Sequence, residues 1–279
     1  MLLQRVLTAI ILIPLVVWGV LAADHWLFAA IVAAVMLLCA WEWARLAGLK
    51  TLPLQLLYVL LCGVLIAALW FIATDGVSRF LILIAAGLWL GMSLALFSWR
   101  HKALHKAAFQ PFILMLGLLL LSAAWQALVS LHQLTDVGPK LTLGLLILIW
   151  IADSAAYFTG KALGRRKLAP VLSPGKTIEG MAGALAAAAV WGVLMFVLLF
   201  QASANSTAYM ISIALLLSLL TAIVSVAGDL FESLVKRRAD MKDSGHLLPG
   251  HGGIWDRIDS LIASAPVFVA GLYLSGILQ

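Results

Sequence analysis

Long uninterrupted apolar stretches constrain the fold of this chain more than any other feature. A membrane core is about 30 Å thick, so a helix needs roughly 20 apolar residues to cross it. Such stretches lie at about 6–23, 26–46, 53–73, 78–98, 110–131, 141–159, 177–200, 206–227 and 259–277. Hydrophobic residues make up 64% of the chain and charged residues only 11%, unlike a soluble domain. The sequence therefore predicts an all-α polytopic integral membrane protein with about nine transmembrane helices.

The basic residues predict how these helices are oriented, because Lys and Arg concentrate in short cytoplasmic loops. With the loops assigned alternately to the two sides, all but Arg79 and Lys140 of the 18 Lys and Arg residues fall on one side. We therefore expect the N-terminus inside and Gln279 outside. The net charge of +6 fits attraction to anionic lipid headgroups of the bilayer. Nucleic acid is not expected as a partner, since the basic residues are dispersed among apolar spans.

Polar residues divide the chain into two regions. Residues 1–140 are predicted to be N-terminal transmembrane helices, and residues 141–279 a C-terminal transmembrane catalytic region with cytoplasmic polar segments at 153–180 and 229–260. In the first region only Trp41-Glu42-Trp43 is unusual. We interpret it as an interfacial anchor, because Trp is enriched where a helix leaves the membrane core. Function is expected in the two polar segments.

The first polar segment contains an acidic residue and a candidate phosphate site. Asp153 stands in the last turns of a span, where a carboxylate is costly unless it faces a partner or a cavity. In "SPGKTIEG", residues 173–180, Lys176 suits a phosphate, and Ser173 or Thr177 can cap the following helix. The spacing does not match the P-loop pattern. A phosphate contact and a purely structural helix start both remain open for this motif.

The second polar segment predicts a magnesium site. Asp256 and Asp259 are three residues apart and share a face of a helix entering the last span, and Asp229 stands at the inner end of the preceding span. An oxygen-rich set without cysteine suits Mg²⁺ bound together with substrate phosphates. We expect Glu232 and Asp240 to be solvated. Gly252 and Gly253 beside His251 permit a close backbone approach to a ligand, or serve a turn alone.

Residues 233–260, "SLVKRRADMKDSGHLLPGHGGIWDRIDS", resemble the signature of the phosphatidate cytidylyltransferases. The residues that match this signature are Ser233, Lys236, Arg237, Lys242, Asp243, Pro249, His251, Gly252, Gly253, Asp256, Arg257 and Asp259. Residues 153–180 also resemble that family's other polar segment, whereas residues 1–140 match only as membrane sequence. The resemblance implies a bacterial-type inner-membrane enzyme of phospholipid biosynthesis.

The implied reaction is Mg²⁺-dependent transfer of the cytidylyl group of CTP to phosphatidic acid, with a monovalent cation such as K⁺ as a further family feature. Asp229, Asp256 and Asp259 would hold the metal. The residues expected to hold phosphate oxygens are Lys176, Arg237, Lys242 and Arg257, with Ser173, Thr177, His251, Gly252 and Gly253 also at the substrate. Asp243 would be a ligand or a partner of Lys242.

Two other functions and a homodimer also remain compatible with parts of the sequence. A CTP-dependent lipid or polyprenol kinase would transfer the γ-phosphoryl group instead and release CDP. A secondary transporter would place its acids near the midplane of both halves, whereas here they cluster at one face of the second half. Small residues such as Ala184 to Ala189 permit close helix contacts, either in a homodimer or within one chain.

Overall fold

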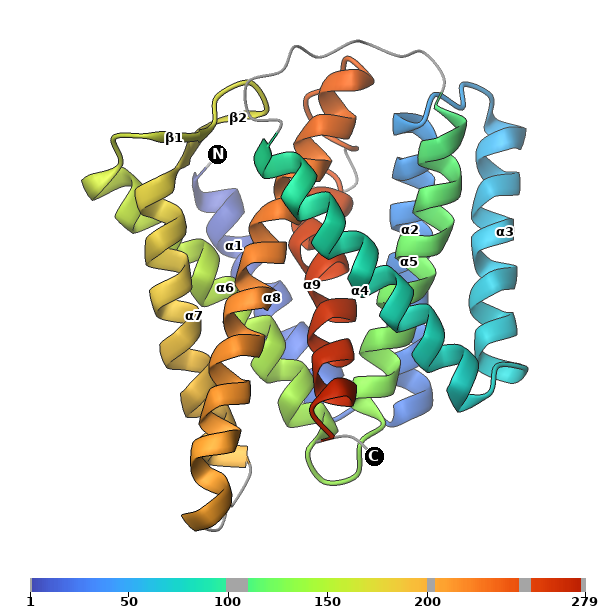
Figure 1. Ribbon diagram of the computed structural model, residues 1–279. Helices are drawn as coiled ribbons and strands as arrows, with labels where there is room; N and C mark the ends of the chain where they lie inside the picture. The colour runs from blue at the N-terminus through green and yellow to red at the C-terminus, as the bar shows by residue number, and fades with distance from the viewer. Residues whose placement is uncertain (1, 99–109, 200–203, 246–251, 277–279) are drawn as a thin grey trace.

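The computed structural model describes residues 2–98, 110–199, 204–245 and 252–276. Its described part is almost entirely helical, which confirms the predicted fold class. The helices are α1 (Leu2–Leu21), α2 (His25–Leu46), α3 (Leu52–Phe71), α4 (Asp75–Ser98), α5 (Pro111–His132), α6 (Gly138–Leu163), α7 (Ile178–Leu199), α8 (Ala204–Arg238) and α9 (Trp255–Leu274). Between α6 and α7 lie two short strands, β1 (Lys167–Ala169) and β2 (Ser173–Thr177). Figure 1 shows the helices as a bundle with the strands at one end.

The helix lengths fit a membrane-spanning bundle. Within the described residues, 8 helices are long and apolar enough to cross a membrane, and α1 adds the shorter apolar helix Leu12–Leu21. The predicted count of about nine is therefore close. Most predicted bounds differ from the observed ones by only a few residues. The exception is α8, which continues from the predicted end at 227 to Arg238, so the first part of the second polar segment is helical.

Local sequence explains where several helices begin. The side chain of Asp24 accepts a hydrogen bond of 2.7 Å from the backbone N–H of Leu27 and caps α2. Pro53, Pro111 and Pro139 each stand in the first turn of a helix. Proline is tolerated there because the first N–H groups of a helix have no partner within it. The apolar stretches are thus divided into separate helices by caps and prolines.

Helix α9 lies inside the bundle, where it packs against α8, α4 and α5 (Figure 1). Near its start the ring of Trp255 lies 4.2 Å from that of Trp43, measured between centroids. The indole N–H of Trp43 also donates a 2.7 Å hydrogen bond to the carbonyl of Ile113 in α5. Both Trp43 and Glu42 are 0% exposed, so the interpretation of this patch as an interfacial anchor was wrong for them. These side chains pack inside the bundle instead.

Helices α6, α7 and α8 meet through small side chains. Ala152 of α6, Ala184 and Ala188 of α7, and Ala222 of α8 belong to one buried cluster with Leu148. Small residues let helix backbones approach closely. At least Ala184 and Ala188 are therefore used for contacts within a single chain.

The two strands form an antiparallel hairpin that joins α6 to α7. The carboxylate of Glu179, in the first turn of α7, accepts hydrogen bonds of 3.0 and 3.1 Å from the backbone N–H groups of Arg165 and Arg166. It also forms a 3.0 Å ion pair with the Arg166 side chain. The Gly-Lys-Thr sequence thus lies on β2, and the hairpin is held against the start of α7.

Candidate active site

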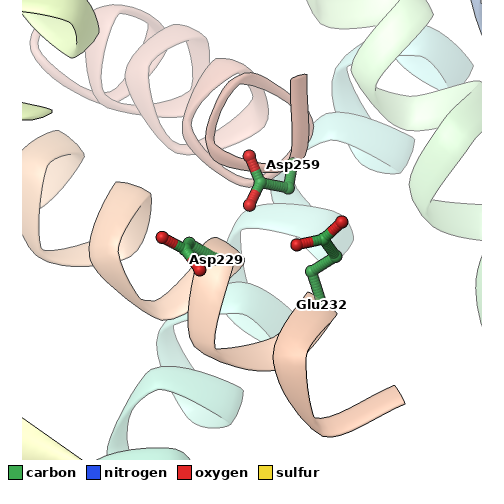
Figure 2. A group of neighbouring side chains, drawn as sticks. All are labelled: Asp229, Glu232 and Asp259. Atoms are coloured by element: carbon green, nitrogen blue, oxygen red, sulfur yellow. The ribbon is translucent and has the colours of Figure 1, made fainter. Parts of the chain in front are cut away.

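Three carboxylates from two helices converge at one place in the bundle (Figure 2). Asp229 and Glu232 are neighbours on α8, and Asp259 faces them from α9. One carboxylate oxygen from each lies within 4.8 Å of the others. Glu232 is 3% exposed and Asp259 9%. The expectation that Glu232 is solvated was therefore wrong, because the extended helix α8 turns this residue inward.

Helices α8 and α9 approach each other closely beside these carboxylates. A Cβ atom at Gly228 would lie 2.8 Å from the backbone oxygen of Asp259, so a larger residue does not fit. One turn apart on α9, the hydroxyls of Ser260 and Ser264 each donate a 3.2 Å hydrogen bond to a backbone carbonyl of α8. Glycine and serine at these positions therefore fix the distance between the two helices that carry the acids.

A buried lysine joins Asp256 to this cluster. The ammonium group of Lys236, on α8, lies 2.8 Å from a carboxylate oxygen of Glu232 and 2.6 Å from Oδ1 of Asp256. Asp256 is thus adjacent to the three grouped carboxylates and is not itself a member of that group.

The hairpin adds a second lysine and brings the two polar segments together. Lys176, on β2, forms a 2.7 Å ion pair with Asp229 and donates a 3.4 Å hydrogen bond to the carbonyl of Val226. Asp153, on α6, is close enough to Lys176 and Asp229 for their charges to act on its carboxylate. Segments 153–180 and 229–260 therefore meet at one site, with Lys176 on its partly exposed side.

The donor set fits a hard divalent cation. Four carboxylates lie close to the ammonium groups of two lysines, Lys176 and Lys236. The carboxylates belong to Asp229, Glu232, Asp256 and Asp259. One oxygen of Glu232, Oε1, is buried with no hydrogen-bond donor among the described residues. A buried carboxylate oxygen without a donor is costly unless a cation contacts it. Oxygen ligands of this kind are those that Mg²⁺ prefers.

The other predicted site residues take different positions. Thr177 is buried, and its hydroxyl accepts a 3.0 Å hydrogen bond from the backbone N–H of Gly180, so it caps α7. Ser173 is half-buried and starts β2, paired with Ala169. His251 lies outside the described residues. Four further predicted site residues are exposed near the end of α8 and the start of α9, namely Arg237, Lys242, Asp243 and Arg257.

Gly252 and Gly253 pack against carboxylates of the protein itself. Gly252 has a φ of +79°, and a Cβ there would lie 2.7 Å from Oδ2 of Asp256. The N–H of Gly253 donates a 2.8 Å hydrogen bond to the same oxygen. The turn interpretation of these glycines therefore has a physical basis in the structure, and their contact with a substrate stays a prediction.

Sequence reasoning missed two acidic residues near the site. A signal for Glu232 existed, because it follows Asp229 by three residues and so shares its helix face. No local signal pointed to Glu42, whose partners lie more than 200 residues later in the chain. Only the packing of α2 beside the start of α9 reveals it.

Comparison with known proteins identifies the family of this chain. Residues 3–275 match the model of the cytidylyltransferase family. The phosphatidate cytidylyltransferase of Pseudomonas aeruginosa is 40% identical over 99% of this chain and 98% of its own length. The phosphatidate cytidylyltransferase of Haemophilus influenzae is 38% identical over 96% of this chain and 97% of its own length. That of Bacillus subtilis is 33% identical over 94% of this chain and 94% of its own length. This integral membrane protein, with its acidic cluster between α8 and α9, therefore belongs to the cytidylyltransferase family.

Proposed function

We propose that this protein transfers the cytidylyl group of CTP to phosphatidic acid, giving CDP-diacylglycerol and pyrophosphate for phospholipid biosynthesis. The observation that carries the proposal is the convergence of four acids and two lysines from both polar segments at one site. Full-length relatives named for this activity support the choice of substrates. The membrane bundle keeps the acyl chains of the lipid in the bilayer while its phosphate meets water-soluble CTP.

The reaction joins two anions. A phosphate oxygen of phosphatidic acid attacks the α-phosphorus of CTP, and the bond from that phosphorus to the pyrophosphate oxygen breaks. The lipid phosphate is already ionised at neutral pH, so no general base is required. Mg²⁺, when bound, supplies charge neutralisation and alignment of the two phosphates. The part of the protein is to hold both reactants in line.

We assign the Mg²⁺ ligands to Asp229 and Asp259, and we add Glu232 to them because the three carboxylates converge. Asp256 stays in the proposed set. Its Oδ1 atom is paired with Lys236, so a cation that binds there would compete with this lysine. K⁺ as a second cation rests on the family resemblance alone.

Basic side chains are proposed to bind the phosphates. Lys176 occupies the partly exposed side of the cluster, where it faces an incoming anion and already neutralises Asp229. Arg237, Lys242 and Arg257 are exposed near the end of α8 and the start of α9 and are proposed to hold the remaining phosphate oxygens. Substrate contacts are also proposed for Ser173, Thr177, His251, Gly252 and Gly253. Asp243 is proposed to pair with Lys242 or to bind the cation.

The site is proposed to face the cytoplasm of a bacterial-type inner membrane, with the N-terminus on the same side. The two polar segments share one end of the bundle (Figure 1), and that end carries most of the basic residues, as cytoplasmic faces do. CTP is available on this side. A homodimer is also retained as a proposal, to be checked by the mass of the detergent-solubilised protein.

The reaction is tested with labelled CTP and detergent-purified protein in micelles that contain phosphatidic acid. With label at the α-phosphate, we expect Mg²⁺-dependent labelled CDP-diacylglycerol. With label at the γ-phosphate, we expect labelled pyrophosphate and no labelled lipid. Label that enters the lipid only from the γ-position would contradict cytidylyl transfer and identify a CTP-dependent kinase.

Lys176 tests the phosphate contact. We expect Lys176→Met to lower kcat/KM by about 10²-fold, the usual loss when one group that stabilises transition-state charge is removed. The melting temperature should change little, because the Lys176–Asp229 pair is partly exposed and such pairs contribute little stability. Steady-state kinetics with varied CTP and phosphatidic acid measure the effect. Lys140→Met, an exposed lysine in the first turn of α6, is the matched control, and equal losses in both variants would refute the contact.

A further inference from the structure

Glu42 is a buried acid that the proposed reaction does not use. It lies near the end of α2, and its side chain is fully enclosed, with 0% exposure. A carboxylate inside a membrane-spanning helix is costly unless other groups satisfy it. Its hydrogen-bond partners therefore indicate its role.

Two partners of Glu42 are backbone groups at the start of α9. The N–H groups of Ile254 and Trp255 donate hydrogen bonds of 3.0 and 2.8 Å to its two carboxylate oxygens. Ile254 is the N-cap residue, and its apolar side chain makes no capping bond. A helix start needs acceptors for its free N–H groups and favours a negative charge. Glu42 supplies both from a different helix.

The third partner, Ser244, connects Glu42 to Asp256. Its hydroxyl lies 2.9 Å from Oε2 of Glu42 and 3.0 Å from Oδ2 of Asp256. The single hydroxyl proton serves one of these acceptors at a time. The backbone N–H of Ser244 donates a further 3.0 Å hydrogen bond to Asp256. Glu42 and Asp256 thus hold Ser244 from two sides, next to the acidic cluster.

Glycines leave room for the Glu42 carboxylate. A Cβ atom at Gly245 or at Gly253 would overlap its oxygens. These glycines belong to the two described ends of the connection between α8 and α9, of which residues 246–251 lie outside the described residues. Glu42 therefore contacts both ends of this connection at once and brings them together at the start of α9.

We propose that Glu42 is a positioning residue of the active site. Glu42 fixes the start of α9 directly, and it fixes Asp256 through Ser244. It thereby sets the direction in which Asp256 and Asp259 face the acids of α8. Its effect on turnover rests on the proposed function. Its effect on cation binding does not, and can be measured without CTP or lipid.

The test uses Glu42→Gln in the purified full-length protein, with Mn²⁺ as the probe. Glutamine keeps the shape, but its NH₂ group cannot accept the bonds that one carboxylate oxygen now receives. We expect the Mn²⁺ dissociation constant, measured by electron paramagnetic resonance, to rise about tenfold or more, as for other residues that orient metal ligands. The Mg²⁺ concentration for half-maximal CDP-diacylglycerol formation should rise in parallel.

A second variant and a control keep the test decisive. Ser244→Ala should also raise the Mn²⁺ dissociation constant. If Glu42→Gln does not fold, this variant alone tests the positioning role. In the double variant the increase in the Mn²⁺ dissociation constant should be smaller than the product of the two single increases, because Glu42 and Ser244 belong to one hydrogen-bond network. The control is Trp125→Phe, which removes a buried 3.0 Å hydrogen bond to the carbonyl of Ala29, also in α2, without touching any of these acids.

The outcomes separate this proposal from the proposed function. Unchanged Mn²⁺ affinity in both variants, an equal change in Trp125→Phe, or a wild-type protein that binds no Mn²⁺ would each overturn the positioning role. A wild-type protein that binds Mn²⁺ but forms no labelled lipid would refute cytidylyl transfer alone. In that case the Mn²⁺ affinities still decide the role of Glu42.

Discussion

Asp259→Asn is expected to reduce CDP-diacylglycerol formation on the order of 10³-fold at saturating substrates. The carboxylate of Asp259 meets those of Asp229 and Glu232 in the buried cluster. Asparagine keeps the volume but removes the negative charge through which Asp259 is proposed to bind a divalent cation. A bound metal contributes several kcal/mol of charge stabilisation, and each 1.4 kcal/mol corresponds to about tenfold in rate. The measurement is the rate of label transfer from α-labelled CTP over a range of Mg²⁺ concentrations.

The matched control for this prediction is Asp240→Asn. Asp240 is exposed, as the sequence predicted, and follows the end of α8 with a φ of +59°. Asparagine tolerates this left-handed conformation, so the variant should retain wild-type activity. Full activity of Asp259→Asn at limiting Mg²⁺ would remove Asp259 from the ligand set.

Lys236→Met is expected to cause the largest loss of stability. Lys236 pairs with Glu232 and Asp256, and the side chains of all three are at most 13% exposed. Removal of the ammonium group leaves two buried carboxylates without their counter-charge, a change that typically costs about 3–5 kcal/mol. The apparent melting temperature in detergent measures this loss. Lys236→Arg, which keeps the charge, should recover much of it.

A second ion pair offers a contrast to Lys236. Arg166→Met breaks the pair with Glu179, but the Arg166 side chain is 71% exposed. Solvent screens such a pair, and Glu179 keeps its backbone bonds to Arg165 and Arg166. We expect little change in melting temperature. Equal losses in Arg166→Met and Lys236→Met would contradict the argument from burial.

The membrane helices were predictable because bilayer thickness imposes a length on each apolar stretch. The exception, α8, shows the limit of that reasoning. Beyond 227 its sequence turns polar, yet the helix continues to Arg238 because Leu230, Phe231, Leu234 and Val235 are buried on one face. Hydropathy detects the apolar part of a helix that lies in lipid. It misses a polar continuation of the same helix beyond the membrane core.

The candidate site was predictable only in part, for a related reason. Asp229 and Asp259 stood out because acids beside apolar spans are rare, and the structure brings them together. Glu42 looked like part of an interfacial Trp patch, since its partners, Ser244, Ile254 and Trp255, lie in a distant segment. Contacts of this kind depend on how helices pack, which local sequence patterns do not encode.

The central position of α9 has a consequence for how the protein is made. In the described part of the chain, eight helices precede α9 in the order of synthesis, and it packs most extensively against three of them, α4, α5 and α8. Until α9 inserts, Glu42 lacks the backbone groups that it caps, and Lys236 lacks Asp256. Asp229 and Glu232 of α8 likewise lack Asp259 beside them until α9 is in place. Because α9 carries two of the four converging acids, Asp256 and Asp259, the candidate site can be complete only after this helix has been synthesised.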